Sequence, residues 1–528
     1  MISNLKHWKT DIPAGLVVFL VAIPLCLGIA LASDAPPLSG IIAGIVGGLV
    51  VTVFSDSSLG VSGPAAGLVA IVVTAITDLG FEHFLLAVVL CGVIQVVLGC
   101  LRAGTIGYYF PTAVIKGMLV AIGLIIVLKQ IPHAVGYDKD YEGDLAFFQK
   151  DGFNTFTEIG HAFEALTPGS IVVTLVCLAI LILWERPSIQ KQKFATIIQG
   201  PLVAVLTGIG LTIAFRGSER FMLEAEHLVK LPTGSFLKQL QFPSLEKIGD
   251  ISIFTTAFTL AIVASIESLL CAEATDKLDP QRRQTNLNRE LCAQGIGNCV
   301  SGLLGGLPVT QVIVRSSTNI QSQAQSRLSA FVHGLLLLVC VASIPQLLNL
   351  IPLASLAAIL FVVGYKLAHP SKFLGMFKLG WTQFLPFLIT IAAILFTDLL
   401  RGIGIGLAAS VFFVLKNNYV RSFWMSSAAD GDRTVHTMTL AENVFFMNKG
   451  SIQSALKEIA PGSKVVIDAS DTVHIDQDVI DIFNDFETHA EFENIEVVRV
   501  DFLKDAKNTD NPARVGKALS GLDSGNPH

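Results

Sequence analysis

Long apolar stretches separated by short polar ones fill the chain up to about residue 430, and they predict membrane-spanning helices. There are two runs of such stretches, with a polar gap between them. The first run covers residues 11–31, 37–54, 64–78, 84–101, 109–131, 168–184 and 196–215. The second run covers residues 251–275, 288–306, 311–325, 328–348, 352–368, 382–399 and 402–424. We therefore predict fourteen transmembrane segments, seven plus seven, of which the third and the tenth are short.

The pattern changes after residue 430. The runs KVVIDAS (464–470) and IEVVRVDF (495–502) are rich in β-branched residues and are typical of strands. Between them, DVIDIFNDFETHAEF (478–492) has apolar residues at helical spacing. Alternating strand and helix signals predict a small soluble α/β domain over residues 435–503, followed by a flexible tail at 504–528.

The composition narrows the class of protein. Of the 528 residues, 52% are hydrophobic and only 15% are charged, and the mean hydropathy is +0.63. These values exclude a disordered chain, a collagen, a disulfide scaffold and a nucleic-acid-binding protein. The eight cysteines lie in or beside apolar stretches and form no CxxC pair, so we expect core thiols rather than metal ligands. No catalytic Ser/His/Asp set, metal cluster or phosphate-binding loop occurs in a suitable context, so we expect neither enzyme activity nor a cofactor.

The distribution of basic residues predicts how the chain enters the membrane. The short loops at 32–36, 79–83 and 346–351 contain no Lys or Arg, whereas alternate loops carry basic residues such as Arg102 and Arg283. By the positive-inside rule this places the N-terminus in the cytoplasm. An even number of spans returns the chain to the same side. We therefore expect a multi-pass protein of the cell (inner) membrane with both termini in the cytoplasm.

The two short segments carry the strongest functional signal. They contain GVSGPAAGLVAIV (Gly60–Val72) and GGLPVTQVIVRSSTN (Gly305–Asn319). Each places Gly and Pro beside a β-branched run and then starts a helix too short to cross a membrane alone. Free N–H groups at such helix starts must line a cavity or be buried by protein, and their partial positive charge attracts an anion. Interrupted segments at matching positions of two halves favour a transporter binding site, and the alternative is a pair of ordinary Gly/Pro kinks.

Ionisable residues inside the predicted spans are the next candidates, because a charge in the membrane is costly without a function or a partner. Arg315 stands at the start of the second short helix and strengthens the anion interpretation. Glu267, in the eighth segment, is a candidate for binding a coupling ion or a proton. The alternative is a structural ion pair between Glu267 and Arg315. Glu273 is a weaker candidate because it lies on another helix face, and His333 is expected to be a hydrogen-bonded packing residue.

Several segments together resemble the sulfate permease (SulP) family of anion transporters, which includes prestin and bacterial bicarbonate transporters. They are PLCLGIALAS in the first span, SGPAAG in the third, ESLLCAEATDKLDP in the eighth and GGLPVTQVIVRSSTN in the tenth. The C-terminal LAENVFFMNKGSI and KVVIDASDTVHID are similar to a STAS domain. The resemblance implies a polytopic α-helical membrane protein with 14 transmembrane segments in a 7+7 inverted repeat, forming core and gate domains. It also implies a small cytoplasmic α/β STAS domain after the transporter domain at 1–430, and a homodimer.

The resemblance further implies an anion held between the N-termini of the third and tenth segments. Carried over by motif, the anion-binding residues are Leu25, Cys26, Ser62, Gly63, Ala65, Ala66, Val312, Ile313, Val314 and Arg315. Several family members have Gln where Leu25 stands, which makes this pocket more apolar. The Asp and Thr of sodium-coupled bicarbonate members correspond to Glu267 and Cys271 here. Because a thiol is a poor ligand for a hard cation, we expect a proton rather than sodium as the coupling ion.

The STAS resemblance departs from the pattern at one loop. Related regulators carry a phosphorylatable Ser soon after the Asp of HID, but here Asp476 is followed by Gln477 and Asp478, so we expect no phosphorylation switch. The predicted function is symport of a small inorganic anion by alternating access. Bicarbonate is the first candidate, because the motifs resemble SulP members associated with carbonic anhydrases. Sulfate comes second and a dicarboxylate third, and the remaining alternatives are a non-transporting anion sensor and an uncoupled channel.

Overall fold

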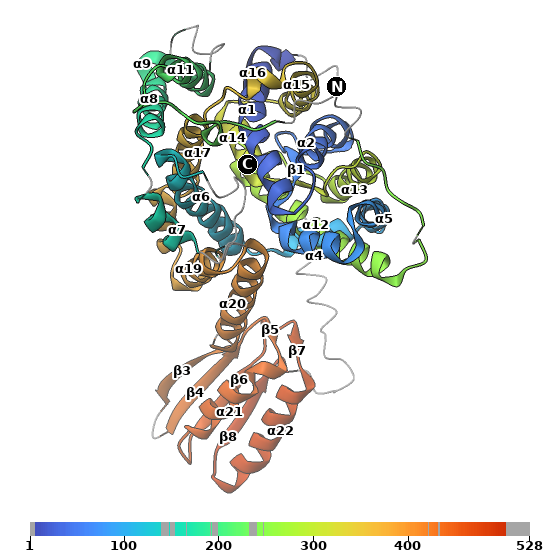
Figure 1. The fold of residues 1–528 in the computed structure, drawn as a ribbon. Coiled ribbons are helices and arrows are strands. Elements are labelled where there is room, and N and C mark those ends of the chain that lie inside the picture. The colour runs from blue at the N-terminus through green and yellow to red at the C-terminus, as the bar shows by residue number, and fades with distance from the viewer. Residues whose placement is uncertain are drawn as a thin grey trace. The chain divides into compact units, whose positions relative to one another are not determined.

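Each of the fourteen predicted apolar segments contains a helix in the computed structural model (Figure 1). In the first run these are α1 (Trp8–Ala32), α2 (Pro37–Val46), α4 (Val69–Leu79), α5 (Phe81–Cys100), α6 (Thr112–Val135), α8 (Pro168–Trp184) and α11 (Gly200–Phe215). In the second run they are α12 (Ile251–Leu278), α13 (Leu287–Leu303), α14 (Ile313–Gln321), α15 (Leu328–Ser343), α17 (Leu353–Leu367), α19 (Trp381–Phe396) and α20 (Leu399–Val420). Short helices lie between them: η2 (Gly47–Val51), α3 (Thr52–Phe54), η3 (Ala66–Leu68), η4 (Ala103–Tyr109), α7 (Thr155–Ala162), α9 (Pro187–Gln190), η5 (Ala225–His227), α16 (Pro345–Leu348) and α18 (Pro370–Phe377).

The structure describes residues 6–138, 147, 154–164, 166–190, 192, 199–231, 240–246, 248–420, 422–430 and 433–502. The predicted tail at 504–528 lies outside these residues. The chain divides into two units, Met1–Ser410 and Val411–His528. Each unit is described by itself below.

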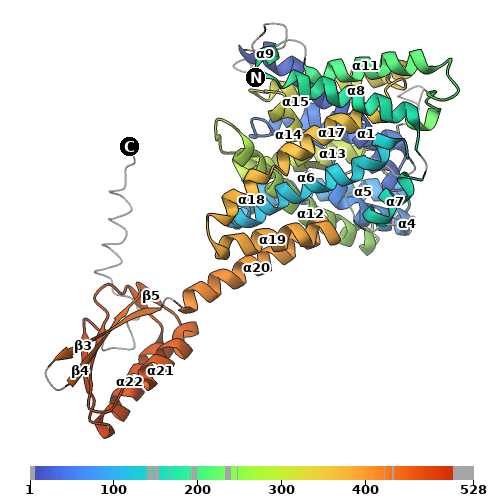
Figure 2. The same ribbon diagram turned by 90° about the vertical axis from the view of Figure 1, so that its left-hand side faces the viewer.

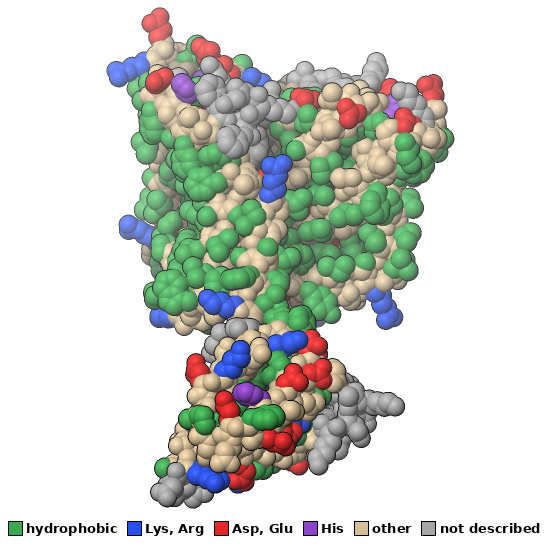
Figure 3. Space-filling model, turned by 90° about the horizontal axis from the view of Figure 1, so that it is seen from below, with side chains coloured by type: hydrophobic (Ala, Val, Ile, Leu, Met, Phe, Trp, Pro, Cys, Tyr) green, Lys and Arg blue, Asp and Glu red, His purple; other side chains and the backbone are tan. Residues whose placement is uncertain are grey.

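The outer surface of the first unit is apolar, as a protein in contact with lipid requires. Within the described residues, seven helices are long and apolar enough to cross a membrane, and five shorter apolar helices accompany them. On the face drawn in Figure 3, hydrophobic side chains are spread over this unit and charged side chains are few. Large apolar side chains such as Leu175, Leu206 and Phe258 are exposed on helix surfaces, where water would penalise them. The first unit is therefore a multi-pass membrane domain.

Its helices pack in two groups, which match the expected core and gate. In the core group, α5 packs against α12 and α13, and α1 packs against α2 and α15. In the gate group, α6 packs against α17 and α19, and α8 packs against α11 and α17; Figures 1 and 2 show α6 and α17 side by side. Small residues allow the closest approaches: a Cβ added at Gly92 of α5 would lie 2.5 Å from the Gly295 carbonyl oxygen of α13. Each group is thus a tightly packed body.

Two short strands lie inside the core group. β1 (Ser62–Pro64) pairs antiparallel with β2 (Val309–Gln311), with Ser62 opposite Gln311 and Pro64 opposite Val309. The preceding helix is wound as a π-helix over η2, which brings its backbone against β1, so that a Cβ added at Gly47 would lie 2.2 Å from the Ser62 carbonyl oxygen. Both strands are fully buried, and their pairing satisfies backbone groups that lipid could not.

The start of β2 is fixed by one buried side chain of α13. Asn298 accepts a hydrogen bond from the Val309 N–H (2.6 Å) and donates to the Val309 carbonyl (2.9 Å) and to Gln95 Oε1 (2.7 Å). The side-chain amide thereby pairs with the backbone of Val309 as a neighbouring strand would. Without it, a backbone N–H and carbonyl would be left unpaired in an apolar interior.

We expect Asn298→Leu to lower stability by about 3 kcal/mol or more, because each buried group left unpaired costs roughly 1–3 kcal/mol. The measurement is the thermal unfolding of the purified protein, where the melting temperature should fall by several degrees. Cys299→Ala is the control, since the next residue lies only half-buried against α5 and holds no strand. An unchanged melting temperature for Asn298→Leu would contradict the role of Asn298.

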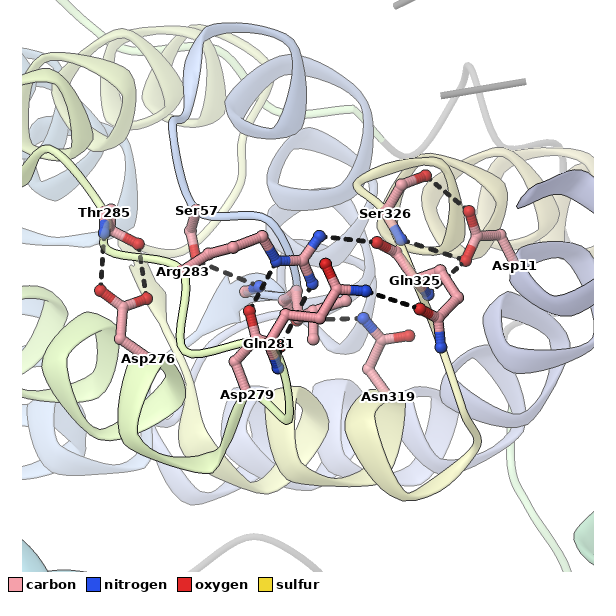
Figure 4. A network of polar contacts seen from close by, with 12 residues as sticks. Asp11, Ser57, Asp276, Asp279, Gln281, Arg283, Thr285, Asn319, Gln325 and Ser326 are labelled. Atoms are coloured by element: carbon pink, nitrogen blue, oxygen red, sulfur yellow. Dashed lines mark hydrogen bonds and ion pairs between the residues drawn. The ribbon is translucent and has the colours of Figure 1, made fainter. Parts of the chain in front are cut away.

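A second polar network joins loops at one end of the core group (Figure 4). Asp11 of α1 accepts hydrogen bonds from the backbone N–H of Gln325 (2.7 Å) and from the hydroxyl of Ser326 (2.5 Å). Arg283 bonds the Asp279 carboxylate at 2.7 Å and the Gln325 carbonyl at 2.8 Å. Burial would raise the pKa of Asp279, but the Arg283 hydrogen bond and other donors outweigh it and lower that pKa. The network holds the end of α14 to α1 and to the loop after α12.

The second unit is a small α/β fold that fits a STAS domain. Its sheet has the order β3-β4-β6-β8: β3 (Phe423–Asp430) and β4 (Arg433–Leu440) are antiparallel, and β6 (Lys464–Asp468) and β8 (Glu496–Val500) continue in parallel. Two helices, α21 (Lys449–Lys457) and α22 (Gln477–Phe492), pack with it, and a short pair β5 (Asn443–Val444) and β7 (His474–Ile475) completes the fold. The predicted strands and helix at 464–502 are present.

Candidate functional site

The helices α4 and α14 both begin beside the β1–β2 pair. α14 follows β2 directly, and α4 follows β1 after the turn η3. The Val312 N–H donates to the Val61 carbonyl (3.0 Å), and the Val61 N–H donates to the Ser316 hydroxyl (3.0 Å), so the start of α14 is tied to the β1 side. Because the strands are antiparallel, the two short helices run away from each other and leave their N-termini together. Their partial positive charges therefore add at one place.

A pocket with ≈ 490 Å³ of empty space lies at this place. Its walls come from α1, the β1 and η3 segment, α6, α12, the start of α14, and α20. Eight predicted site residues line it: Leu25, Ala66, Val312, Ile313, Val314, Arg315, Glu267 and Cys271. The remaining lining residues are Ile29, Pro64, Ile122 and Leu399. The predicted anion and coupling residues thus share one cavity.

Four predicted residues do not line this pocket. The Ser62 hydroxyl accepts a hydrogen bond from Gln294 of α13 (2.8 Å) instead. Gly63 lies against the Arg315 guanidinium, so that an added Cβ would be 1.9 Å from Nη1. Cys26 is buried beside the same guanidinium, and Ala65 is buried in the turn before η3. These residues support the pocket wall from behind.

Side chains on one face of α12 accept hydrogen bonds from the starts of both short helices, α4 and α14. The Glu267 carboxylate accepts a hydrogen bond from the Gly67 N–H at the start of α4. One turn later, the Cys271 thiol accepts from the Ile313 N–H at the start of α14. Residues four apart lie on the same helix face, so both side chains reach the site together. A change in the charge of Glu267 would therefore act directly on both the α4 terminus and the pocket.

Glu267 also lines a second, narrow pocket. This pocket has ≈ 300 Å³ of empty space and is otherwise lined mainly by apolar residues of α6, α12 and α20, among them Met118, Val263 and Ile403. Its Oε2 has no hydrogen-bond partner among the described residues. The carboxylate is thus accessible from a cavity but paired with no cation of the described chain, which suits a group that binds and releases a proton.

Arg315 is the largest fully buried side chain of the described protein, with 1% exposure. Its Nη1 has no hydrogen-bond partner among the described residues, and no ion pair joins it to Glu267 or to another described carboxylate. The structural ion pair considered from the sequence is therefore not formed. The uncompensated guanidinium adds a full positive charge to the two helix termini.

The prediction that His333 is hydrogen-bonded is wrong. His333 is fully buried on α15 near Arg315, and neither ring nitrogen has a partner in the described chain. Two further pocket residues, Ile122 of α6 and Leu399 of α20, are not predicted, because in the sequence they look like any other apolar residue of a span.

A third cavity, with ≈ 760 Å³ of empty space, lies between the groups at the far end of α14. It is lined by Val17 of α1, the end of α14 and residues of α8, α11 and α17. The Gln199 amide at the start of α11 donates to the Ser322 carbonyl at the end of α14 (3.3 Å). Lys366 and Glu185 form an ion pair at the rim. The cavity thus lies where α1 and α14 of the core group face α8, α11 and α17.

Comparison with known proteins agrees with this arrangement. The family model described as "Sulfate permease family" matches residues 8–392. The Bacillus subtilis (strain 168) protein YvdB, which is named provisionally as a sulfate transporter, is 28% identical over 461 residues, covering 86% of this chain and 84% of YvdB. The bicarbonate transporter BicA of Picosynechococcus sp. is 26% identical over 452 residues, covering 83% of this chain and 76% of BicA.

Solved structures show the same fold. The transmembrane domain of a cyanobacterial BicA aligns with a TM-score of 0.53 at 24% identity, covering 77% of this chain and 98% of that one. Murine Slc26a9, an anion transporter solved in the inward-facing state, aligns with a TM-score of 0.66 at 16% identity, covering 97% of this chain and 87% of that one. With a match over most of its length and a pocket of this geometry, the chain belongs to the sulfate permease family and is a multi-pass membrane anion transporter, not an enzyme.

Proposed function

We propose that this chain is a secondary active transporter of a small inorganic anion, with bicarbonate as the first candidate, and that it works by alternating access with proton coupling. The observation that supports this most is the electropositive pocket. Two helix N-termini meet there, the buried guanidinium of Arg315 lies behind the wall against Gly63 and Cys26 without a described carboxylate partner, and a negative solute is the natural counter-charge. The anion-binding residues of the proposal are those predicted from the sequence, and six of these ten line the pocket.

The chemistry of the wall supports a small anion. The pocket offers backbone N–H groups and one cation, while Leu25, Ile29, Ile122 and Leu399 form apolar walls that have no hydrogen bonds to give. A large polar substrate would leave its own groups unpaired against such walls. Sulfate is the second candidate, because relatives named for sulfate transport and for bicarbonate transport are similarly close to this chain.

Glu267 is the proposed coupling group. It contacts the start of α4, lines the pocket and has no described cation partner. The residue one turn away is Cys271, whose thiol is a poor ligand for sodium. A proton requires no further ligands, so a single carboxylate suffices for coupling.

The proposal also includes the domain boundaries, the oligomeric state and the orientation of the chain in the membrane. The transporter domain spans 1–430 and the STAS domain spans 435–503, in a homodimer of the cell (inner) membrane with both termini in the cytoplasm. The basic residues of alternate loops support this orientation. The cavity at the end of α14 would then open toward the cytoplasm, and the anion would pass between the core and gate groups.

The test is uptake of radiolabelled bicarbonate and of radiolabelled sulfate into proteoliposomes under imposed proton or sodium gradients. Protein-free liposomes measure the background from CO₂ diffusion. We expect saturable bicarbonate uptake above that background, stimulated by an inward proton gradient and indifferent to sodium. Uptake driven by sodium would overturn proton coupling, and sulfate uptake that bicarbonate does not inhibit would replace the first substrate by the second. The absence of both fluxes would favour a sensor.

A further inference from the structure

Three side chains form a buried cluster at the end of α6 away from the cavity beside Lys366. His133 is on the last turn of α6, Asp138 follows it in the chain, and His227 lies 89 residues further on, in the linker between α11 and α12. His133 Nδ1 lies 2.6 Å from one carboxylate oxygen of Asp138, and His227 Nδ1 lies 2.7 Å from the other. All three side chains are less than 10% exposed. A carboxylate held by two imidazoles at these distances makes short, charge-assisted hydrogen bonds.

The cluster lies where the two helix groups are joined. The chain leaves the gate group after α11 and enters the core group at α12, and it returns from α15 to α17 through α16. These two linkers pair with each other: the Val229 N–H donates to the Ile351 carbonyl (3.0 Å), and the Leu231 N–H donates to Asn349 Oδ1 (2.7 Å). Asn349 returns a hydrogen bond to the Leu231 carbonyl (3.1 Å). His227 stands two residues before this pairing, so Asp138 anchors both linkers to the gate helix α6.

We propose that His133, Asp138 and His227 form a pH-dependent clasp that holds the linkers between core and gate and thereby sets how easily the two groups move. This inference rests on the proposed alternating access for its effect on transport. The clasp itself, as a titrating attachment of the linker, does not depend on it. In this view the histidines regulate the motion and Glu267 couples it to the proton gradient.

The charged groups around His133, Asp138 and His227 influence the pKa values of these three side chains. From the linker, Glu226 Oε1 lies 3.8 Å from His227 Nε2, and Glu224 acts at longer range. From α6, Lys129 lies one turn before His133 and is paired with Glu158 of α7 at 3.8 Å. The hydrogen bond with Asp138 raises the pKa of His227. Burial would raise the pKa of Asp138, but the hydrogen bonds from His133 and His227 outweigh it and lower that pKa.

The sign of the pH effect follows from these directions. A group whose pKa is raised in the folded protein contributes stability that is complete below its ordinary pKa, about 6.5 for His, and that is lost as the pH rises through the raised value. Asp138 remains ionised throughout this window because its own pKa is lowered. The clasp is therefore closed at mildly acidic pH and loosens as the pH on its side of the membrane increases. Turnover should rise accordingly.

The test is hydrogen–deuterium exchange of the full-length protein in lipid nanodiscs, followed in peptides that contain Val229 and Leu231 and corrected for the intrinsic pH dependence of exchange. We expect the opening equilibrium of this linker to rise roughly 10-fold between pH 6 and pH 9, as the loss of a charge-assisted hydrogen bond implies. His227→Asn places an amide near the position of Nδ1 and does not titrate, so its opening should be independent of pH. His133→Asn is a second variant, and the opening equilibrium of its linker should depend less steeply on pH than that of the wild type.

His161→Asn is the matched control, because His161 is an exposed histidine of α7 that lies beside Glu164. It should retain the wild-type pH profile. A linker whose corrected exchange does not change with pH, or a His227→Asn protein with the wild-type slope, would overturn the clasp. If exchange follows the expected profile but no variant or wild-type protein moves an anion, the clasp stands and the proposed transport function fails.

Discussion

Glu267→Gln is expected to abolish the accumulation of anion that an inward proton gradient drives. A gradient of about two pH units supplies about 2.7 kcal/mol per proton, which supports roughly a 100-fold concentration ratio for a one-to-one symport without a membrane potential. The amide keeps an oxygen that can accept from the Gly67 N–H, but it cannot carry a proton. The initial rate of gradient-driven uptake of labelled bicarbonate into proteoliposomes should therefore fall to that of protein-free liposomes, while exchange of labelled for unlabelled anion continues. The initial rate is measured because CO₂ diffusion brings bicarbonate to the same final ratio without the protein.

Glu273→Gln is the control for this prediction. Glu273 lies on the same helix, is partly exposed and pairs with Lys277 at 3.2 Å, outside the pocket. Its substitution should leave the gradient-driven initial rate as in the wild type. A Glu267→Gln protein that keeps the wild-type gradient-driven rate would remove Glu267 from the coupling mechanism. A protein that loses exchange as well would show that Glu267 binds or shapes the site rather than coupling it.

The helices and the two broken segments could be predicted from the sequence because their signals are local. A run of apolar residues of span length is helical whatever surrounds it, since lipid leaves the backbone no other partner. Gly63 and Pro64, or Gly306 and Pro308, interrupt such a run within a few residues. The same signal recurs at equivalent positions in the two halves. This recurrence predicts that the two interrupted segments, which contain β1 and β2, lie close together.

The direction of individual side chains at the site could not be predicted in the same way. Whether Ser62 faces the pocket or α13 depends on the register of β1 against β2. In the structure Ser62 faces α13, and its hydroxyl accepts a hydrogen bond from Gln294. Ile122 and Leu399 reach the pocket from other helices, and nothing in an apolar run marks the one residue that faces a cavity. The clasp needs His227 to meet Asp138 across 89 residues, a contact that only the packed fold provides.

Arg315→Met is expected to weaken anion binding while the protein becomes no less stable. A unit charge about 8 Å from an anion, at an effective dielectric constant of about 20, contributes about 2 kcal/mol, so the apparent affinity should fall roughly 30-fold. A buried charge without a carboxylate partner is itself costly, so its replacement by an apolar side chain of similar length should maintain or raise the melting temperature. Concentration-dependent uptake gives the apparent affinity, and thermal unfolding of the same sample gives the stability.

Arg315→Lys separates charge from shape. A lysine retains the positive charge but loses the planar guanidinium that lies against Gly63 and Cys26, so most of the affinity should remain while packing suffers. The two variants should therefore differ in opposite senses, with Met losing affinity and Lys losing stability. If instead both variants melt earlier and bind the anion as the wild type does, Arg315 is a packing residue, and the positive potential of the pocket must come from the termini of α4 and α14 alone.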